Sequence, residues 1–367
     1  PANCVPEKQF PVLADILRDA LQQSPSMVSK NLELAQAEAR LIMSESQRWP
    51  RLSGSAREVA EAVSVSSGGN AYNTGTGFFY NLSLNQPLYH WGAISADVKI
   101  AELQLKMRQK DYAEAYRQLV SSLRAQFLNL ILQKKVLRSR EFSRDLAEKK
   151  FAVDLQKNKS GAVSAGQIHA AELALAETRL TTARTARDFR QAKRVFLKLA
   201  GMAELPDERI PDTLERPVSS LEGIQALTAS GMAIPERPQS QSYRMQVQQK
   251  ELEYKIARVR NLPNLDFQAS TGLDNQINTS AHTATQTATY RHNVGVVMNW
   301  NIFDGFYARG AKRSALAGKR QAERQLQTFL ESQEESQRTM IEQMELAGQA
   351  EDLAERRRLD AANSFEY

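Results

Sequence analysis

A run of 68 residues without glycine or proline, from Ala93 to Ser160, constrains this chain more than any other feature. Glycine and proline are the strongest helix breakers, and an uninterrupted helix of this length would extend about 100 Å. Helices in globular domains rarely run so far. The sequence therefore predicts an elongated, mainly helical protein.

The segment just before this run has the alternating pattern of a two-faced β-strand. Residues two apart in a strand share a face, so alternation of apolar and polar residues separates the two kinds. Phe79 breaks the polar side. We predict one face with Phe78, Tyr80, Leu82 and Leu84, and another with Asn81, Ser83 and Asn85.

Three further segments are strand candidates. Arg51 to Val65 is the weakest, Asn264 to Leu273 alternates cleanly, and Tyr290 to Trp300 alternates with His292 as an interruption. The last of these leads, through Gly305, into a second long stretch without proline. Apolar positions in these two later strands include Leu265, Phe267, Val294, Val296 and Met298, and polar ones include Asn293 and Asn299.

A shared offset indicates that the chain contains a duplicated unit. Three landmarks of the first half recur 213 residues later, and a common offset is the signature of an internal repeat. Each half is predicted to contain a helix, two strands around a polar loop, a long helix, a turn and a return helix. The paired landmarks are Pro25 with Pro238, Pro50 with Pro263, and Gly92 with Gly305.

The expected domain boundaries follow from this repeat. The polar loops are expected at Ser66 to Thr76 and Asp274 to Thr289, a short helix at Ser219 to Ser230, and Ser24 as an N-cap before Pro25. The offset puts the second turn beyond Tyr367, so we expect the second return helix to be absent. The predicted parts are N-terminal helices (1–50), a β-hairpin (51–91), a helical hairpin (92–201) with its tip near 158–165, a linker (202–240), a repeat helix (241–263), a second β-hairpin (264–303) and a long helix (304–367).

The strands are the part of the chain that could enter a membrane. No stretch approaches 18 consecutive apolar residues, so a transmembrane helix is not expected. Four strands are too few to close a barrel, and a spanning sheet cannot leave its edges in hydrocarbon. Three chains would supply 12 strands. Aromatic residues near the strand ends favour this interpretation: Tyr80, Tyr89, Trp91, Tyr290 and Trp300.

Taken together, these stretches resemble the TolC family of outer-membrane channel proteins, and the resemblance covers nearly the whole chain. Each motif is short, but their order, spacing and duplication are specific. They comprise residues 20–25 (ALQQSP) and 235–238 (PERP), the helix-to-strand turns 49–52 (WPRL) and 262–265 (LPNL), the strand-to-helix turns 86–92 (QPLYHWG) and 301–305 (NIFDG), and 197–201 (LKLAG). Pro87 lies within the fifth of these.

The resemblance implies a homotrimer with a 12-stranded outer-membrane barrel and a periplasmic tunnel of helical hairpins. Such proteins are exit ducts of tripartite efflux pumps or type I secretion systems, and they work with a periplasmic adaptor and an inner-membrane transporter. It also implies that the turn Lys159, Ser160, Gly161, Ala162, Val163 and Ser164 docks the adaptor. The cargo, drugs or secreted protein, stays open, and the family's acidic gate rings would lie around or beyond the end of this chain.

No enzyme, cofactor or metal site is expected. His90, His169, His282, His292 and the single cysteine Cys4 show no metal-ligand spacing. The formal net charge is +6, but basic residues are interspersed with acidic ones, as on a solvated helical face. Two alternatives remain: a soluble periplasmic coiled-coil scaffold with a small β-domain, and a nucleic-acid-binding helical protein with salt-dependent affinity.

Overall fold

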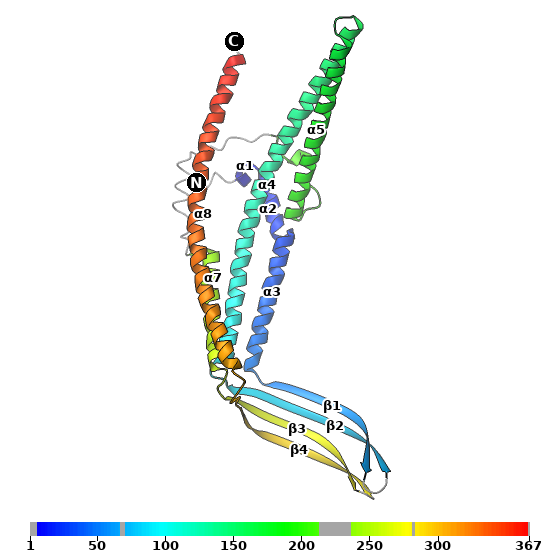
Figure 1. The fold of residues 1–367 in the computed structure, drawn as a ribbon, viewed down its shortest axis with the longest axis vertical. Coiled ribbons are helices and arrows are strands. Elements are labelled where there is room, and N and C mark those ends of the chain that lie inside the picture. Colours follow the sequence, from blue (N-terminus) through cyan, green and yellow to red (C-terminus); the bar gives the residue numbers. More distant parts are fainter. Residues whose placement is uncertain (1–5, 67–69, 213–235, 281–282, 366–367) are drawn as a thin grey trace. The chain divides into compact units, whose positions relative to one another are not determined.

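The computed structural model describes residues 6–66, 70–212, 236–280 and 283–365. Helix α4 (Ala93–Lys159) forms the predicted uninterrupted helix, and α5 (Ala165–Ala200) is the predicted return helix. Figure 1 shows these two helices joined by a turn into a hairpin. The other helices are α1 (Pro6–Gln9), α2 (Pro11–Gln23), α3 (Pro25–Glu45), α7 (Pro238–Val259) and α8 (Tyr307–Phe365), with short 3-10 turns η1 (Ser46–Arg48) and η2 (Asp207–Arg209).

The four strands form one antiparallel sheet in the order β1-β2-β3-β4 (Figure 1). They are β1 (Arg51–Ser66), β2 (Asn70–Tyr89), β3 (Asn264–Ser280) and β4 (Thr283–Asn299). Strand β1 is paired with β2 along its whole length, as β3 is with β4, whereas β2 pairs with β3 from Tyr80 to Tyr89. Strands β1 and β4 therefore form the two outer edges of the described sheet.

The prediction of polar loops at Ser66 to Thr76 and Asp274 to Thr289 is wrong, because most of these residues form strands. Strand β2 already begins at Asn70, β3 continues to Ser280, and β4 begins at Thr283. Glycine, asparagine and serine disfavour strands locally, but each of these segments pairs with the other strand of its own hairpin, which satisfies the backbone N–H and C=O groups on that side. Continuous ladder pairing outweighs the weak local preference for a loop.

The chain is divided into two compact units, each assembled from segments far apart in the sequence. One comprises Pro1–Leu34, Arg108–Gln241 and Leu330–Tyr367, and the other Ala35–Met107 and Ser242–Phe329. The sheet and its junctions with the helices belong to the second unit. In that unit, α7 and α8 contact each other through stacked rings of Tyr243 and Phe329, whose centroids are 4.4 Å apart.

The first unit has an apolar core where α2, α4 and α5 meet. Apolar residues recur on α4 every three or four positions, so one stripe of this helix faces the core. Phe127 is completely buried and touches Phe10 and Phe196, with ring centroids 5.8 and 5.9 Å away. The buried members on α4 are Leu119, Leu123, Phe127, Leu130 and Ile131.

The end of α5 fits closely against the connection between α2 and α3. Gly201 has φ = 76°, and a Cβ built on it would lie 2.2 Å from the carbonyl oxygen of Gln23. The hydroxyl of Ser24 donates a hydrogen bond to the carbonyl oxygen of Leu199, 2.9 Å away. Ser24 precedes α3 as predicted, and this bond joins it to α5 as well.

Some expectations concern residues outside the described ranges. These are the short helix at Ser219 to Ser230, Cys4 and His282. Among the described helices, none is both long and apolar enough to cross a membrane.

Candidate functional site

The strand register gathers the predicted apolar residues on one face of the sheet. Leu84 lies opposite Ala269, which lies opposite Val294 on β4, and directly opposed residues in antiparallel strands share a face. The same register places Phe267 opposite Val296 and Leu265 opposite Met298. This face is open in the single chain, and Val294 is 74% exposed. Its predicted members are Phe78, Tyr80, Leu82, Leu84, Leu265, Phe267, Val294, Val296 and Met298.

The predicted polar residues share the opposite face. Ser83 lies opposite Ser53 on one side and Ser270 on the other, and its hydroxyl is 2.8 Å from that of Ser53. The register adds Asn81, Asn85, Asn293 and Asn299 to this face. The sheet is therefore two-faced across β2, β3 and β4.

Two of the exceptions to the alternation, Phe79 and His292, have local partners. Phe79 lies on the polar face opposite Arg57, whose guanidinium carbon is 4.9 Å from the ring centroid, a cation–π contact. His292 lies on the apolar face opposite Thr271, and its Nδ1 is 2.8 Å from the threonine hydroxyl. Each exception is paired across the strands instead of being left unpartnered.

Both strand-to-helix junctions use two successive residues in the left-handed region. These are Trp91 and Gly92 before α4 (φ = 53° and 78°), and Gly305 and Phe306 before α8 (φ = 65° and 68°). Glycine adopts this conformation without strain, but an aromatic residue is an outlier there. The predicted junction glycines thus turn the chain from strand to helix, each beside a strained aromatic residue.

The predicted junction prolines lie where a backbone donor is not needed. On one side, Pro87 lies opposite Asp266 of β3, next to an irregularity in the register. On the other side it has no partner on β1, because that strand begins opposite Asn85. Pro50 separates η1 from β1, and Pro263 directly precedes β3. The carbonyl oxygen of Pro263 accepts a hydrogen bond from Trp91 Nε1, 2.9 Å away.

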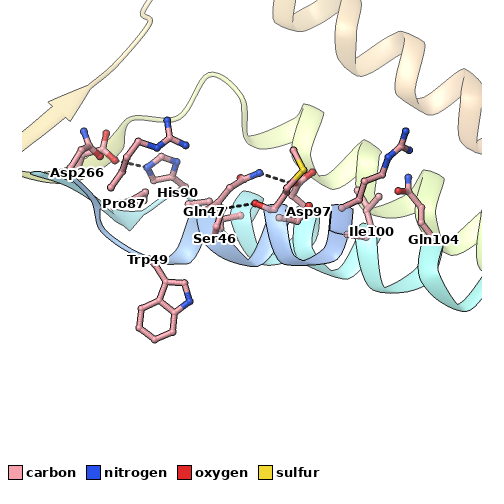
Figure 2. A pocket seen from close by; sticks show the side chains of 16 residues that line it. Ser46, Gln47, Trp49, Pro87, His90, Asp97, Ile100, Gln104 and Asp266 are labelled. Carbon is pink, nitrogen blue, oxygen red and sulfur yellow. Dashed lines mark hydrogen bonds and ion pairs between the residues drawn. The ribbon is translucent and has the colours of Figure 1, made fainter. Parts of the chain in front are cut away.

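At the first junction a nearly buried carboxylate connects the two hairpins. Asp266 on β3 lies 2.9 Å from His90 Nε2 and accepts a second hydrogen bond from Asn299 Nδ2, at 3.3 Å. Figure 2 shows this pair at one end of a hollow of about 940 Å³, which Trp49 also lines. The sequence offered one signal for this site, since Asp266 is the single charged residue between Asn264 and Leu273.

The second junction has a smaller hollow of about 420 Å³. Arg260 lies over the ring of Tyr307, with its guanidinium carbon 4.5 Å from the ring centroid. The carboxylate of Asp304 accepts a hydrogen bond from the Ala308 N–H, 2.8 Å away, in the first turn of α8. The six lining residues are Arg260, Asn261, Asn301, Phe303, Asp304 and Tyr307.

The helical hairpin tip has a well-defined turn. Gly161 is left-handed (φ = 79°), and the side-chain amide of Asn158 donates to the carbonyl oxygen of Val163, 2.7 Å away. Ser164 and Gln167 form a capping box at the start of α5. The left-handed Gly161 and the Ser164 N-cap thus define where α4 ends and α5 begins. The predicted docking residues are Lys159, Ser160, Gly161, Ala162, Val163 and Ser164, and all except the half-buried Val163 are exposed.

Charged networks in the first unit support the helices and involve none of the predicted site residues. Arg117 donates two hydrogen bonds to Glu114 on α4, and they lower the pKa of this carboxyl, partly opposed by its burial. Lys134 and Arg138 bind Asp212, and a hydrogen bond from Lys134 is the main cause of the lowered pKa of Asp212. Within the described residues, no group of three or more His, Cys, Asp or Glu side chains could hold a metal ion.

A two-faced antiparallel sheet that continues directly into long helices is the architecture of outer-membrane channel proteins. A sequence profile of the family described as "Outer membrane efflux protein" matches residues 16–202, half of the chain. The chain belongs to this family, which confirms the predicted outer-membrane location and efflux role. No curated protein sequence gives a significant match.

Solved channel structures share the fold. The CmeC outer membrane channel of Campylobacter jejuni is 18% identical, with a TM-score of 0.67 over 87% of this chain and 68% of the other. VceC from Vibrio cholerae is 17% identical, with a TM-score of 0.63 over 90% and 78%. The open state of the MtrE channel of Neisseria gonorrhoeae is 14% identical, with a TM-score of 0.57 over 87% and 70%.

Proposed function

We propose that three copies of this chain form one outer-membrane duct, with the apolar face of the sheet against lipid and the polar face lining a water-filled lumen. The observation that carries this proposal is the two-faced sheet with two outer edges. An unpaired strand edge is costly in hydrocarbon, because each free N–H and C=O lacks a partner there. Strand β1 of one copy pairing with β4 of the next removes both edges, and three copies make 12 strands.

The lengths of the strands support this placement. A tilted transmembrane strand needs about 9–11 residues. The alternating parts, Phe78 to Tyr89 and Tyr290 to Asn299, are close to this length. Both strands continue beyond these parts into segments rich in Asn, Thr and Gly, which would project from the membrane at the far end of the barrel.

The hairpin of α4 and α5 would form part of the periplasmic tunnel and carry the docking surface. Its tip is a fixed turn of exposed residues, as a docking site for a periplasmic adaptor requires. An inner-membrane transporter would complete the tripartite assembly. Polar side chains line the lumen and keep it hydrated, so the duct conducts cargo passively and catalyses no reaction. These lumen residues are Asn81, Ser83, Asn85, Asn293 and Asn299. The repeat supplies a second helical wall through α8.

The oligomeric mass of the full-length protein tests the proposal. We expect it to stay in the membrane fraction in buffer and to be extracted by detergent as a trimer. A charged substitution on the apolar face, Val296→Lys, should reduce insertion strongly, whereas Gly295→Lys on the polar face should be tolerated. Extraction in buffer as a monomer, or equal effects of the two substitutions, would contradict the proposed placement.

A further inference from the structure

The hollow at the second junction is lined by three polar side chains that have no salt-bridge or hydrogen-bond partner among the described residues. Arg260 makes its cation–π contact with Tyr307, but no carboxylate among the described residues pairs with its guanidinium. The side-chain amides of Asn261 and Asn301 likewise have no hydrogen-bond partner in the described part of the chain. One cation and two amide groups thus line the same hollow, and these are the donors that bind phosphate oxygens.

The hollow is held open by well-defined contacts. The indole N–H of Trp300 donates to the carbonyl oxygen of Asn261, 3.0 Å away, and so joins the turn before β3 to the end of β4. Tyr307 restrains the guanidinium on one side. Asp304 is fixed by its bond to the Ala308 N–H. A phosphate group would therefore meet an arrangement that is already formed.

The surroundings of this hollow indicate what kind of ligand approaches it. Ile302, Phe303 and Phe306 are 75%, 72% and 67% exposed. Phe306 also adopts a left-handed conformation that is unfavourable for a phenylalanine, and its ring packs edge-on against that of Phe303, with centroids 5.5 Å apart. Exposed aromatic and aliphatic residues at the end of a membrane strand are typical of the headgroup region of a bilayer.

We propose that this hollow binds the headgroup of a phosphatidylethanolamine molecule in the inner leaflet of the outer membrane. Arg260, Asn261 and Asn301 bind the phosphodiester, and Asp304 faces the ammonium group. The acyl chains lie against the exposed apolar residues beside the strand. This inference rests on the proposed function, because it needs the sheet to lie in the membrane.

The first junction does not contain the same set of headgroup-binding side chains. With the offset of 213 residues, Gln47 takes the place of Arg260, and its amide is already bound to Asp97, 3.0 Å away. Trp91 takes the place of Asp304, and His90 that of Phe303. The two carboxylates that line the first hollow, Asp97 and Asp266, are already bound to Gln47 and His90, so neither is left for the ammonium group of a lipid, and we expect one headgroup site per chain.

Lipid retention by the detergent-extracted trimer tests the proposal. Extraction from membranes is scored first, and bound lipids are then counted by native mass spectrometry for wild type, Arg260→Gln, Asp304→Asn and Arg258→Gln. Arg258 is the matched control, since it is an exposed arginine on the last turn of α7 that does not line the hollow. Asn at position 304 keeps an oxygen for the Ala308 N–H.

We expect wild type and Arg258→Gln to retain about one phosphatidylethanolamine per chain, and Arg260→Gln to retain roughly tenfold less. Asp304→Asn should keep a lipid but lose the preference over phosphatidylglycerol. Equal losses in the two arginine variants, no retained lipid in an extracted trimer, or displacement of the lipid by inorganic phosphate would each overturn the proposal. A wild-type protein that does not need detergent would instead contradict the proposed function.

Discussion

The helical core of the first unit and the strand-to-helix junctions of the second use apolar residues in opposite ways. In the core, Leu123, Phe127 and Leu130 are fully buried by other parts of the same chain. At the junctions, Ile302, Phe303 and Phe306 stay largely exposed. The apolar side chains of the core are covered within a single chain, whereas those of the junctions are not.

This difference separates folding residues from assembly residues. Burial of a large apolar side chain typically contributes about 1.5–3 kcal/mol, so the core side chains stabilise the isolated chain. Exposed junction residues contribute little until lipid or another chain covers them. Substitutions in the two regions should therefore change the free energy of unfolding by different amounts, and for some residues in opposite directions.

The largest expected effect is that of Gly201→Ala in the core. The new Cβ would lie 2.2 Å from the Gln23 carbonyl oxygen, in addition to the strain of a left-handed alanine, so we expect a loss of about 4 kcal/mol in the free energy of unfolding. Gly92→Ala is the matched control at a junction, with φ = 78° and no atom within 4 Å of the added Cβ. It should lose only about 1–2 kcal/mol. Equal losses in denaturant unfolding would show that the close contact at Gly201 contributes nothing.

An intermediate effect is expected for Asp266→Ala, at a junction position that is nearly buried. This change leaves His90 and Asn299 without their acceptor, and we expect a loss of about 2 kcal/mol. Asp97→Ala is the control, because Asp97 is less buried and binds Gln47 in an exposed hydrogen bond. It should lose less than about 0.5 kcal/mol. Hydrogen exchange in β3 should rise only in the first variant, and an unchanged β3 would argue against the connecting role of Asp266.

Phe306→Asn and Trp91→Asn should have effects of opposite sign in detergent. Asparagine tolerates the left-handed region, so replacing Phe306 relieves strain and should stabilise the protein by up to about 1 kcal/mol. Trp91 is equally strained, but its indole donates to the Pro263 carbonyl oxygen and its ring packs against Tyr89, with centroids 5.0 Å apart. Losing both contacts should cost about 2 kcal/mol, which exceeds the relieved strain and leaves a net loss of about 1 kcal/mol. Thermal unfolding of both variants compares them directly. If Phe306→Asn also destabilises, the phenylalanine is covered by the protein itself.

Local signals in the sequence predicted the helices well. The absence of glycine and proline located α4 to within one residue, and the tip predicted near 158–165 coincides with the turn before α5. These signals depend on residues close together in the chain. The two faces of the sheet could be predicted for the same reason, because alternation is a local pattern.

The remaining features depend on pairing between distant segments and could not be read from local patterns. The polar segments form strands because a hairpin partner satisfies their backbone, although their residues favour loops. The bond between His90 and Asp266 joins residues 176 positions apart, and the contact between Arg260 and Tyr307 requires two separate turns to meet. Such contacts follow from strand register, which no single segment specifies.

The smallest expected effect is a change in the pH dependence of unfolding when Glu114 becomes glutamine. Hydrogen bonds from Arg117 lower the pKa of this carboxyl in the folded state, so the folded protein holds the ionised form more strongly than the unfolded chain does. Its contribution is fully present above the unfolded pKa of about 4.3 and is lost as the pH falls through the lower folded value. Glu114→Gln should therefore flatten the decline of stability below about pH 4.3. Glu177→Gln removes an exposed carboxylate from α5 and should leave the decline unchanged. If both variants give the wild-type slope, the interaction between Glu114 and Arg117 is screened by water and does not contribute to the stability of the helical region.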